Sequence, residues 1–79
     1  MLYVYILNSL INTDRMYVGI THNLENRLQE HNSGECIHTS KYKPWKIMTY
    51  LHFDSKEKAV AFEQYLKSGS GRSFAKRHF

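Results

Sequence analysis

The sequence predicts a small α+β fold, in which a β-hairpin, a helix, a third strand and further helices follow one another. Two runs rich in tyrosine, valine and isoleucine, residues 2–8 and 15–20, predict the hairpin, because these residue types favour strands. Apolar residues that recur every three to four positions elsewhere predict the helices. The 79 residues have room for one small domain, which we expect to span residues 1–79.

The hairpin predicts a pair of tyrosines on one face of the sheet. Residues 2–8 are apolar on both faces, as in a central strand. With a loop at residues 9–13, the numbers of paired residues sum to about 22, which places Tyr5 opposite Tyr17. Gly19 gains nothing from packing inside a strand and indicates the close approach of another group.

The next segment predicts a helix over residues 23–33, with Thr21 or Asn23 as its N-cap. Arg27 and His31 are four residues apart, so they project from neighbouring turns of one helix face. Arg27 is suited to binding phosphate oxygens, and His31 to relaying a proton or holding the nucleophile. The alternatives are a surface ion pair for the arginine and a contact of the histidine with the helix dipole.

Residues 35–46 predict a basic loop, and residues 46–53 a third strand. The loop and the start of the strand interleave cations with aromatic rings: Lys41, Tyr42, Lys43, Trp45 and Lys46. This composition suits phosphate contacts and base stacking in a nucleic-acid complex. The alternative, equally compatible with the pattern, is a core Trp45 flanked by solvated lysines.

The C-terminal part predicts two helices. A capping sequence at residues 54–57 begins a helix that runs to about residue 67. Glu63 lies at the edge of its apolar stripe, where it can face a cleft or pair with Lys67 at i+4. Gly69 and Gly71 are interpreted as turn glycines that break the chain before a short helix over residues 72–78.

Charge and cysteine content narrow the class of partner. Eleven Lys and Arg against seven Asp and Glu give a net charge of +4, which favours a polyanion such as nucleic acid. Cys36 is the only cysteine, which excludes an internal disulfide and a cysteine zinc cluster and fits a reducing, cytoplasmic setting. No apolar run approaches 18 residues, so we expect neither export nor a membrane partner.

The candidate residues suit phosphodiester hydrolysis. This reaction needs an activated water, stabilisation of charge on the phosphoryl oxygens and help for the leaving oxygen, and a divalent metal contributes to the last two. Because Mg²⁺ is commonly held by one or two carboxylates plus the substrate phosphate, one glutamate such as Glu63 is chemically sufficient. The alternative for the tyrosines is ordinary strand packing.

In the ordered set Tyr5, Tyr17-Val18-Gly19, Arg27, His31 and Glu63, the chain resembles the GIY-YIG endonuclease superfamily. It looks most like the small stand-alone bacterial members and the N-terminal nuclease domain of excision-repair nucleases. The resemblance covers essentially the whole chain and is carried by four fragments, at residues 17–21, 23–32, 43–45 and 62–72. It implies a three-stranded antiparallel sheet flanked by helices, with the two tyrosine strings on adjacent strands.

The resemblance also implies a role for each site residue. Tyr17 matches the general base, and Tyr5 the residue that helps to hold the water and the phosphate. Arg27 matches the phosphate-stabilising arginine, His31 the residue one turn further on, and Glu63 the single metal ligand. The first string is Tyr-Val-Tyr where the family name has Gly-Ile-Tyr, and His38 is a candidate for an additional active-site histidine.

The function so implied is a Mg²⁺- or Mn²⁺-dependent endonuclease that hydrolyses DNA, with structure selectivity and a link to repair or recombination. Two alternatives are a non-catalytic nucleic-acid-binding module on the same fold and a protein-interaction adaptor. We identify no added DNA-binding module in the sequence, and a homodimer and an accessory protein are both open alternatives, since the sequence does not give the oligomeric state.

Overall fold

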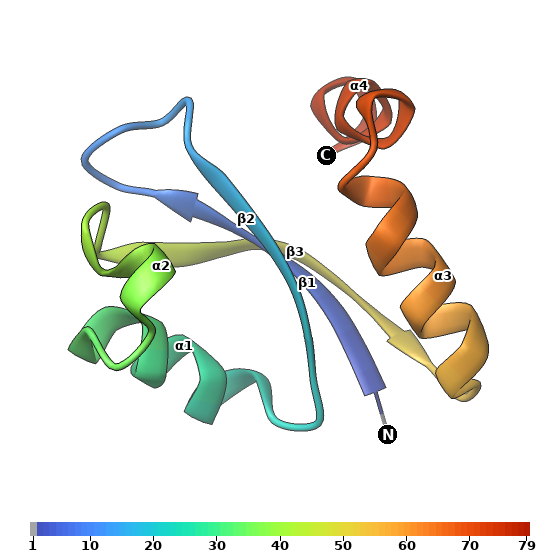
Figure 1. The fold of residues 1–79 in the computed structure, drawn as a ribbon, viewed down its shortest axis with the longest axis horizontal. Coiled ribbons are helices and arrows are strands. Elements are labelled where there is room, and N and C mark those ends of the chain that lie inside the picture. Colours follow the sequence, from blue (N-terminus) through green and yellow to red (C-terminus); the bar gives the residue numbers. More distant parts are fainter. Residues whose placement is uncertain (1) are drawn as a thin grey trace.

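The architecture is a three-stranded antiparallel sheet with helices on both sides (Figure 1). A computed structural model describes residues 2–79 and has the strand order β2-β1-β3. The elements are β1 (Leu2–Ser9), β2 (Met16–Thr21), α1 (Leu24–Ser33), α2 (Ile37–Ser40), β3 (Trp45–Phe53), α3 (Lys56–Leu66) and α4 (Gly69–His78). The predicted α+β class and the three-stranded antiparallel sheet are confirmed. No helix within residues 2–79 is long and apolar enough to span a membrane.

The central strand β1 separates two cores. On one face, Val4 and Ile6 pack with Ala59, Leu66 and Ala75 of α3 and α4. On the other face the buried residues are aromatic or polar as well as aliphatic, and α1 and α2 cover them. Figure 1 shows α1 and α2 on one side of the sheet and α3 and α4 on the other. Because β1 is buried on both faces, it is the central strand that its apolar sequence predicts.

The hairpin register differs from the predicted one by two residues. Tyr5 pairs with Gly19, and Tyr17 pairs with Leu7, so the prediction that Tyr5 lies directly opposite Tyr17 is wrong. The reason is that the five-residue loop lies one position further along the chain: the Ser9 N–H donates to the Arg15 carbonyl at 3.1 Å, so the loop spans residues 10–14 instead of 9–13.

The two-residue difference leaves both phenols on the same face, because side chains in a strand alternate with a period of two. The ring centroids of Tyr5 and Tyr17 are 6.3 Å apart. Gly19 has the role expected from its sequence position, since a Cβ there would overlap the Tyr5 phenol. The glycine of the second string thus makes room for the tyrosine of the first.

Three local predictions change in the structure. The segment at residues 35–46 contains the short helix α2. The helix α4 begins at Gly69, because the Ser68 hydroxyl caps it by accepting from the Gly71 N–H at 3.1 Å. The interpretation of Gly69 and Gly71 as turn glycines is therefore wrong. A Cβ at Gly71 would overlap the carbonyl of Tyr65, so this glycine lets α4 approach α3 closely.

Candidate active site

A buried hydrogen-bond network joins β1 to α1. The Tyr5 side chain is 2% exposed, and its Oη lies 3.0 Å from Nε2 of His31. The Arg27 Nε–H donates to the same oxygen at 3.2 Å. Asn23 caps α1 through its side chain, and the spacing of four residues then brings Arg27 and His31 to the sheet together. Three of the sequence-predicted site residues therefore meet at one phenol oxygen.

The hydrogen bonds around His31 indicate which of its nitrogens carries the proton. The Thr39 hydroxyl donates to the Cys36 carbonyl at 3.2 Å, so its oxygen accepts from the Nδ1–H of His31 at 2.8 Å. Nε2 is then the free acceptor, and it receives the Tyr5 Oη–H. In this assignment each donor and acceptor in the chain of bonds has one partner, which holds the Tyr5 phenol in a single orientation.

Burial sets the charge states in this network. It raises the pKa of the Tyr5 phenol to about 12, against the opposing effect of the Arg27 cation. It also lowers the pKa of His31, and Arg27 adds to this lowering while Glu30 counters it. The pKa of Arg27 is raised by its hydrogen bonds to Tyr5 and Glu30. Near neutral pH the site therefore holds a neutral phenol, a neutral imidazole and a fixed guanidinium charge.

The Arg27 guanidinium is hydrogen-bonded to Tyr5 on its inner side and is exposed on its outer side. Its side chain is 36% exposed, and Nη1 contacts Glu30 Oε1 at 2.8 Å. Arg27 also lines a pocket of about 370 Å³ between the end of β2 and the start of α1. The surface ion pair expected as an alternative role therefore forms, and the same guanidinium also faces a recess in which an anion could bind.

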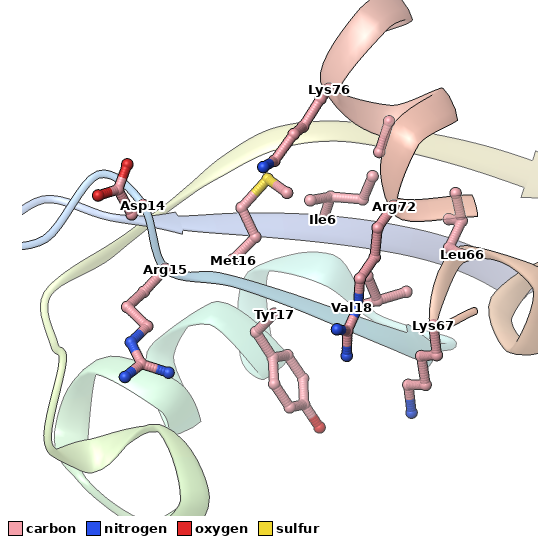
Figure 2. A pocket seen from close by; sticks show the side chains of 11 residues that line it. Ile6, Asp14, Arg15, Met16, Tyr17, Val18, Leu66, Lys67, Arg72 and Lys76 are labelled. Atoms are coloured by element: carbon pink, nitrogen blue, oxygen red, sulfur yellow. The ribbon is translucent and has the colours of Figure 1, made fainter. Parts of the chain in front are cut away.

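Tyr17 stands beside the network without being part of its hydrogen-bond chain. Its ring centroid lies 4.8 Å from that of His31. The side chain is half-buried, and its hydroxyl points away from the β2 ribbon (Figure 2). Of the two phenols, Tyr5 is locked in the core and Tyr17 is accessible, which suits Tyr5 to a supporting role and Tyr17 to contact with substrate.

Glu63 does not join this group directly. It belongs to α3, which packs on the opposite face of the sheet, and its Oε2 lies 2.6 Å from the Lys67 ammonium. The side chain of Glu63 is 16% exposed, and Lys67 lines a pocket that Tyr17 also lines. The i+4 pairing expected as the alternative is present. Glu63 and the Tyr5 network therefore belong to opposite faces of the sheet.

The donor set determines what kind of metal site is possible here. Residues 2–79 contain no cluster of three or more His, Cys, Asp and Glu side chains that could hold a metal ion. A fully protein-ligated ion such as structural Zn²⁺ therefore does not fit. The single Glu63 carboxylate fits Mg²⁺, which keeps several waters and takes further oxygens from a substrate phosphate.

The predicted nucleic-acid-binding segment divides into two parts. Lys41, Lys43 and Lys46 are exposed, as phosphate contacts require. Trp45 is only 4% exposed, and its Nε1–H donates to the Thr39 carbonyl at 2.8 Å. The prediction that Trp45 stacks on a base is wrong, because its ring is enclosed in the core, and the core alternative is correct.

Thr39 is the site residue that sequence reasoning missed. Its hydroxyl orients His31 and its carbonyl accepts from Trp45, so the core tryptophan supports the network through it. The predicted extra histidine, His38, is the exposed preceding residue, and no hydrogen bond joins it to the described network. No sequence periodicity indicated Thr39, because α2 has only four residues.

The comparisons with known proteins agree with this geometry. Residues 1–77 match the profile of the GIY-YIG catalytic domain. UPF0213 proteins of Streptococcus pyogenes serotype M3 and serotype M1 are each 36% identical over 72 residues, which cover 90% of this chain and 76% of the relative. The solution NMR structure of a UPF0213 protein from Bacillus halodurans has a TM-score of 0.57 and 31% identity, covering 96% of this chain and 81% of that one. The chain belongs to the GIY-YIG family.

Proposed function

We propose that this protein is a metal-dependent endonuclease that hydrolyses phosphodiester bonds in DNA. The observation that carries the proposal is the locked Tyr5–Arg27–His31 network next to the accessible Tyr17. Packing alone would need neither an arginine bonded to a buried phenol nor a histidine held through both ring nitrogens. Family membership supports a nuclease, and the residues that match the family pattern are those that the fold brings together.

In the proposed mechanism, the scissile phosphate lies against the exposed side of Arg27. The guanidinium balances the charge that develops on the phosphoryl oxygens. Tyr17 orients the attacking water and, in its phenolate form, takes the proton of that water to become the neutral phenol, while His31 packs against the Tyr17 ring. Tyr5 contributes by fixing the position of Arg27, because its oxygen accepts the Arg27 Nε–H. Each group then acts without having to reorganise during the reaction.

The proposed cofactor is Mg²⁺ or Mn²⁺, held by Glu63 together with water and the substrate phosphate. Such an ion would supply a Lewis acid for the phosphoryl and leaving oxygens. Glu63 already holds a positive charge, that of Lys67, against its carboxylate. The ion pair between Glu63 and Lys67 is therefore expected to change when the metal ion and DNA bind together.

The finer parts of the proposal follow from the resemblance. Similarity to the excision-repair type favours a structure-selective enzyme for flapped or branched DNA, with a role in repair or recombination. Cys36 is a free thiol in a structure without a disulfide among residues 2–79, and such a thiol fits a reducing, cytoplasmic location.

A cleavage assay tests the proposal. Wild type, Arg27→Ala and Glu63→Ala are incubated with single-stranded, flapped and branched DNA in Mg²⁺, in Mn²⁺ and in EDTA. We expect cleavage by wild type in metal only, and a loss of roughly 10²-fold or more in each variant. The matched controls Arg77→Ala and Glu57→Ala remove the same side-chain types from exposed helix positions and are expected to keep wild-type rates.

Equal cleavage by wild type and both site variants would overturn the nuclease assignment. The exposed lysines Lys41, Lys43 and Lys46 favour one competing function, a non-catalytic nucleic-acid-binding module. That function predicts salt-sensitive binding to every substrate without cleavage in any metal. A protein-interaction adaptor predicts neither binding nor cleavage.

A further inference from the structure

A second pocket, of about 530 Å³, lies between β2 and α4 (Figure 2). Ile6, Val18 and Leu66 are among the apolar residues in its lining. Four cationic side chains also line it: Arg15, Lys67, Arg72 and Lys76. Among residues 2–79, Asp14 is the one acidic residue that lines the pocket, so the cations outnumber the acids. The pocket therefore suits an anion.

Three of these cations, Arg15, Arg72 and Lys76, have no counter-ion among residues 2–79. Lys67 is paired with Glu63, and the Arg15 guanidinium lies 4.6 Å from the centre of the Tyr42 ring. Neither Arg72 nor Lys76 takes part in an ion pair within residues 2–79. Both belong to α4 and lie four residues apart, so they project from neighbouring turns on one face of the helix. Their charges remain available to a ligand.

Tyr17 connects this pocket with the candidate active site. It lines the pocket, and its ring also packs against His31. The strand that carries it, β2, is at the edge of the sheet, so its outer side is unpaired within the described residues. In Figure 2 the side chains of Arg15, Tyr17, Arg72 and Lys67 extend toward the same side of the view. A chain of phosphates could pass from Tyr17 along this edge.

We propose that the β2–α4 pocket binds backbone phosphates of the DNA strand that is cut, with Arg72 and Lys76 as its principal contacts. The proposal rests on the proposed function for the identity of the strand. Arginine suits a phosphate because its planar guanidinium donates two parallel hydrogen bonds. These contacts ignore base identity, so they position the strand without giving sequence preference. Trp45 is buried and does not position the DNA, so this role belongs to the β2–α4 pocket instead.

Binding without cleavage tests the proposal separately from the nuclease assignment. Fluorescence anisotropy of a labelled flapped DNA is measured in EDTA at several salt concentrations. The pocket variant is Arg72→Gln with Lys76→Gln. The matched control is Arg77→Gln with Lys58→Gln, which removes the same two charges from exposed positions that do not line the pocket. Thermal melts of both variants verify that the fold is retained.

We expect the dissociation constant of the pocket variant to rise roughly tenfold, and its salt slope to fall by about 1.4 to 1.8, for two lost phosphate contacts. The control variant should stay within about twofold of wild type. Equal effects in the two variants, or wild-type binding by the pocket variant, would overturn the proposal. Loss of binding in the pocket variant together with an absence of cleavage in any metal would support the pocket and overturn only the nuclease assignment.

Discussion

The two faces of the sheet share the central strand β1 but bury different kinds of side chain. The buried residues of the α3/α4 face, such as Val4, Ala59 and Leu66, are aliphatic or small and need only shape, and phenylalanine rings pack around them. The α1/α2 face buries a phenol, an imidazole and a threonine hydroxyl, each with a hydrogen-bond partner. No buried side-chain polar atom among the described residues lacks a partner. The first face mainly supports stability, and the second holds a fixed arrangement of polar groups.

The largest expected effect of a mutation is on the aliphatic face. Gly71→Ala places a Cβ onto the Tyr65 carbonyl and must displace α4 from α3. We expect a loss of about 3 kcal/mol in the free energy of unfolding, measured by urea denaturation. Gly69→Ala is the matched control, because a Cβ there has nothing within 4 Å. Equal stability of the two variants would contradict the close helix contact.

Gly19→Ala makes the corresponding change on the polar face. The new Cβ overlaps the Tyr5 phenol, so the ring must move and its bond to His31 must lengthen or break. We expect a loss of about 2 kcal/mol in stability and a fall of roughly 10²-fold in cleavage rate. We expect Gly19→Ala to lose more activity per kcal/mol of lost stability than Gly71→Ala. This difference would show that the two faces have different roles.

Alkaline pH should weaken the polar face selectively. The Tyr5 pKa is about 12 in the folded protein and 10.0 in the unfolded chain, so the unfolded chain loses its proton first. Stability linked to this group is complete below pH 10 and is lost between pH 10 and about 12, by about 2 to 3 kcal/mol. Unfolding free energies measured across this range should fall less steeply in Tyr5→Phe, and as steeply as wild type in the exposed control Tyr50→Phe.

His31 makes the free energy of unfolding depend on pH in the opposite direction, with stability lost as the pH falls. Because the pKa of His31 is lowered in the folded protein, the unfolded chain binds the proton more readily. Stability from this group is present above the unfolded pKa of about 6.5 and is lost as the pH falls through it. Tyr5 and His31 are therefore expected to weaken the polar face at both extremes of pH.

The smallest expected effect is that of Thr39→Val. The substitution removes the acceptor for the Nδ1–H of His31 at nearly constant volume. We expect a loss of about 1 to 2 kcal/mol in stability and a mixture of His31 tautomers in ¹⁵N NMR spectra. Ser40→Ala, which removes a hydroxyl bonded to the Ile37 carbonyl of the same helix, should change neither measurement of the network.

Local patterns predicted the elements well, and contacts between distant segments were harder to predict. The apolar run of β1, the cap at Asn23 and the spacing of Arg27 and His31 all act within a few residues. The register depended on the position of a five-residue loop whose turn residues allow more than one closure. The start of α4 depended on a serine cap that outweighed the low helix propensity of two glycines.

The site shows the same division between local and distant information. The residues of the two tyrosine strings and of α1 were predicted because their order along the chain resembles that of the GIY-YIG family. Thr39, Arg72 and Lys76 reach the site region only through tertiary packing. Trp45 was ambiguous because an aromatic residue among lysines has the same sequence pattern on the surface and in a core.

We propose that the polar face of the sheet performs the chemistry through the accessible phenol of Tyr17. The most direct measurement is the metal-dependent cleavage rate of Tyr17→Phe, with Tyr50→Phe as the matched control on an exposed position of β3. We predict a loss of roughly 10²-fold or more in Tyr17→Phe with unchanged DNA binding, and wild-type cleavage in the control. Wild-type cleavage by Tyr17→Phe would contradict a catalytic role for this phenol.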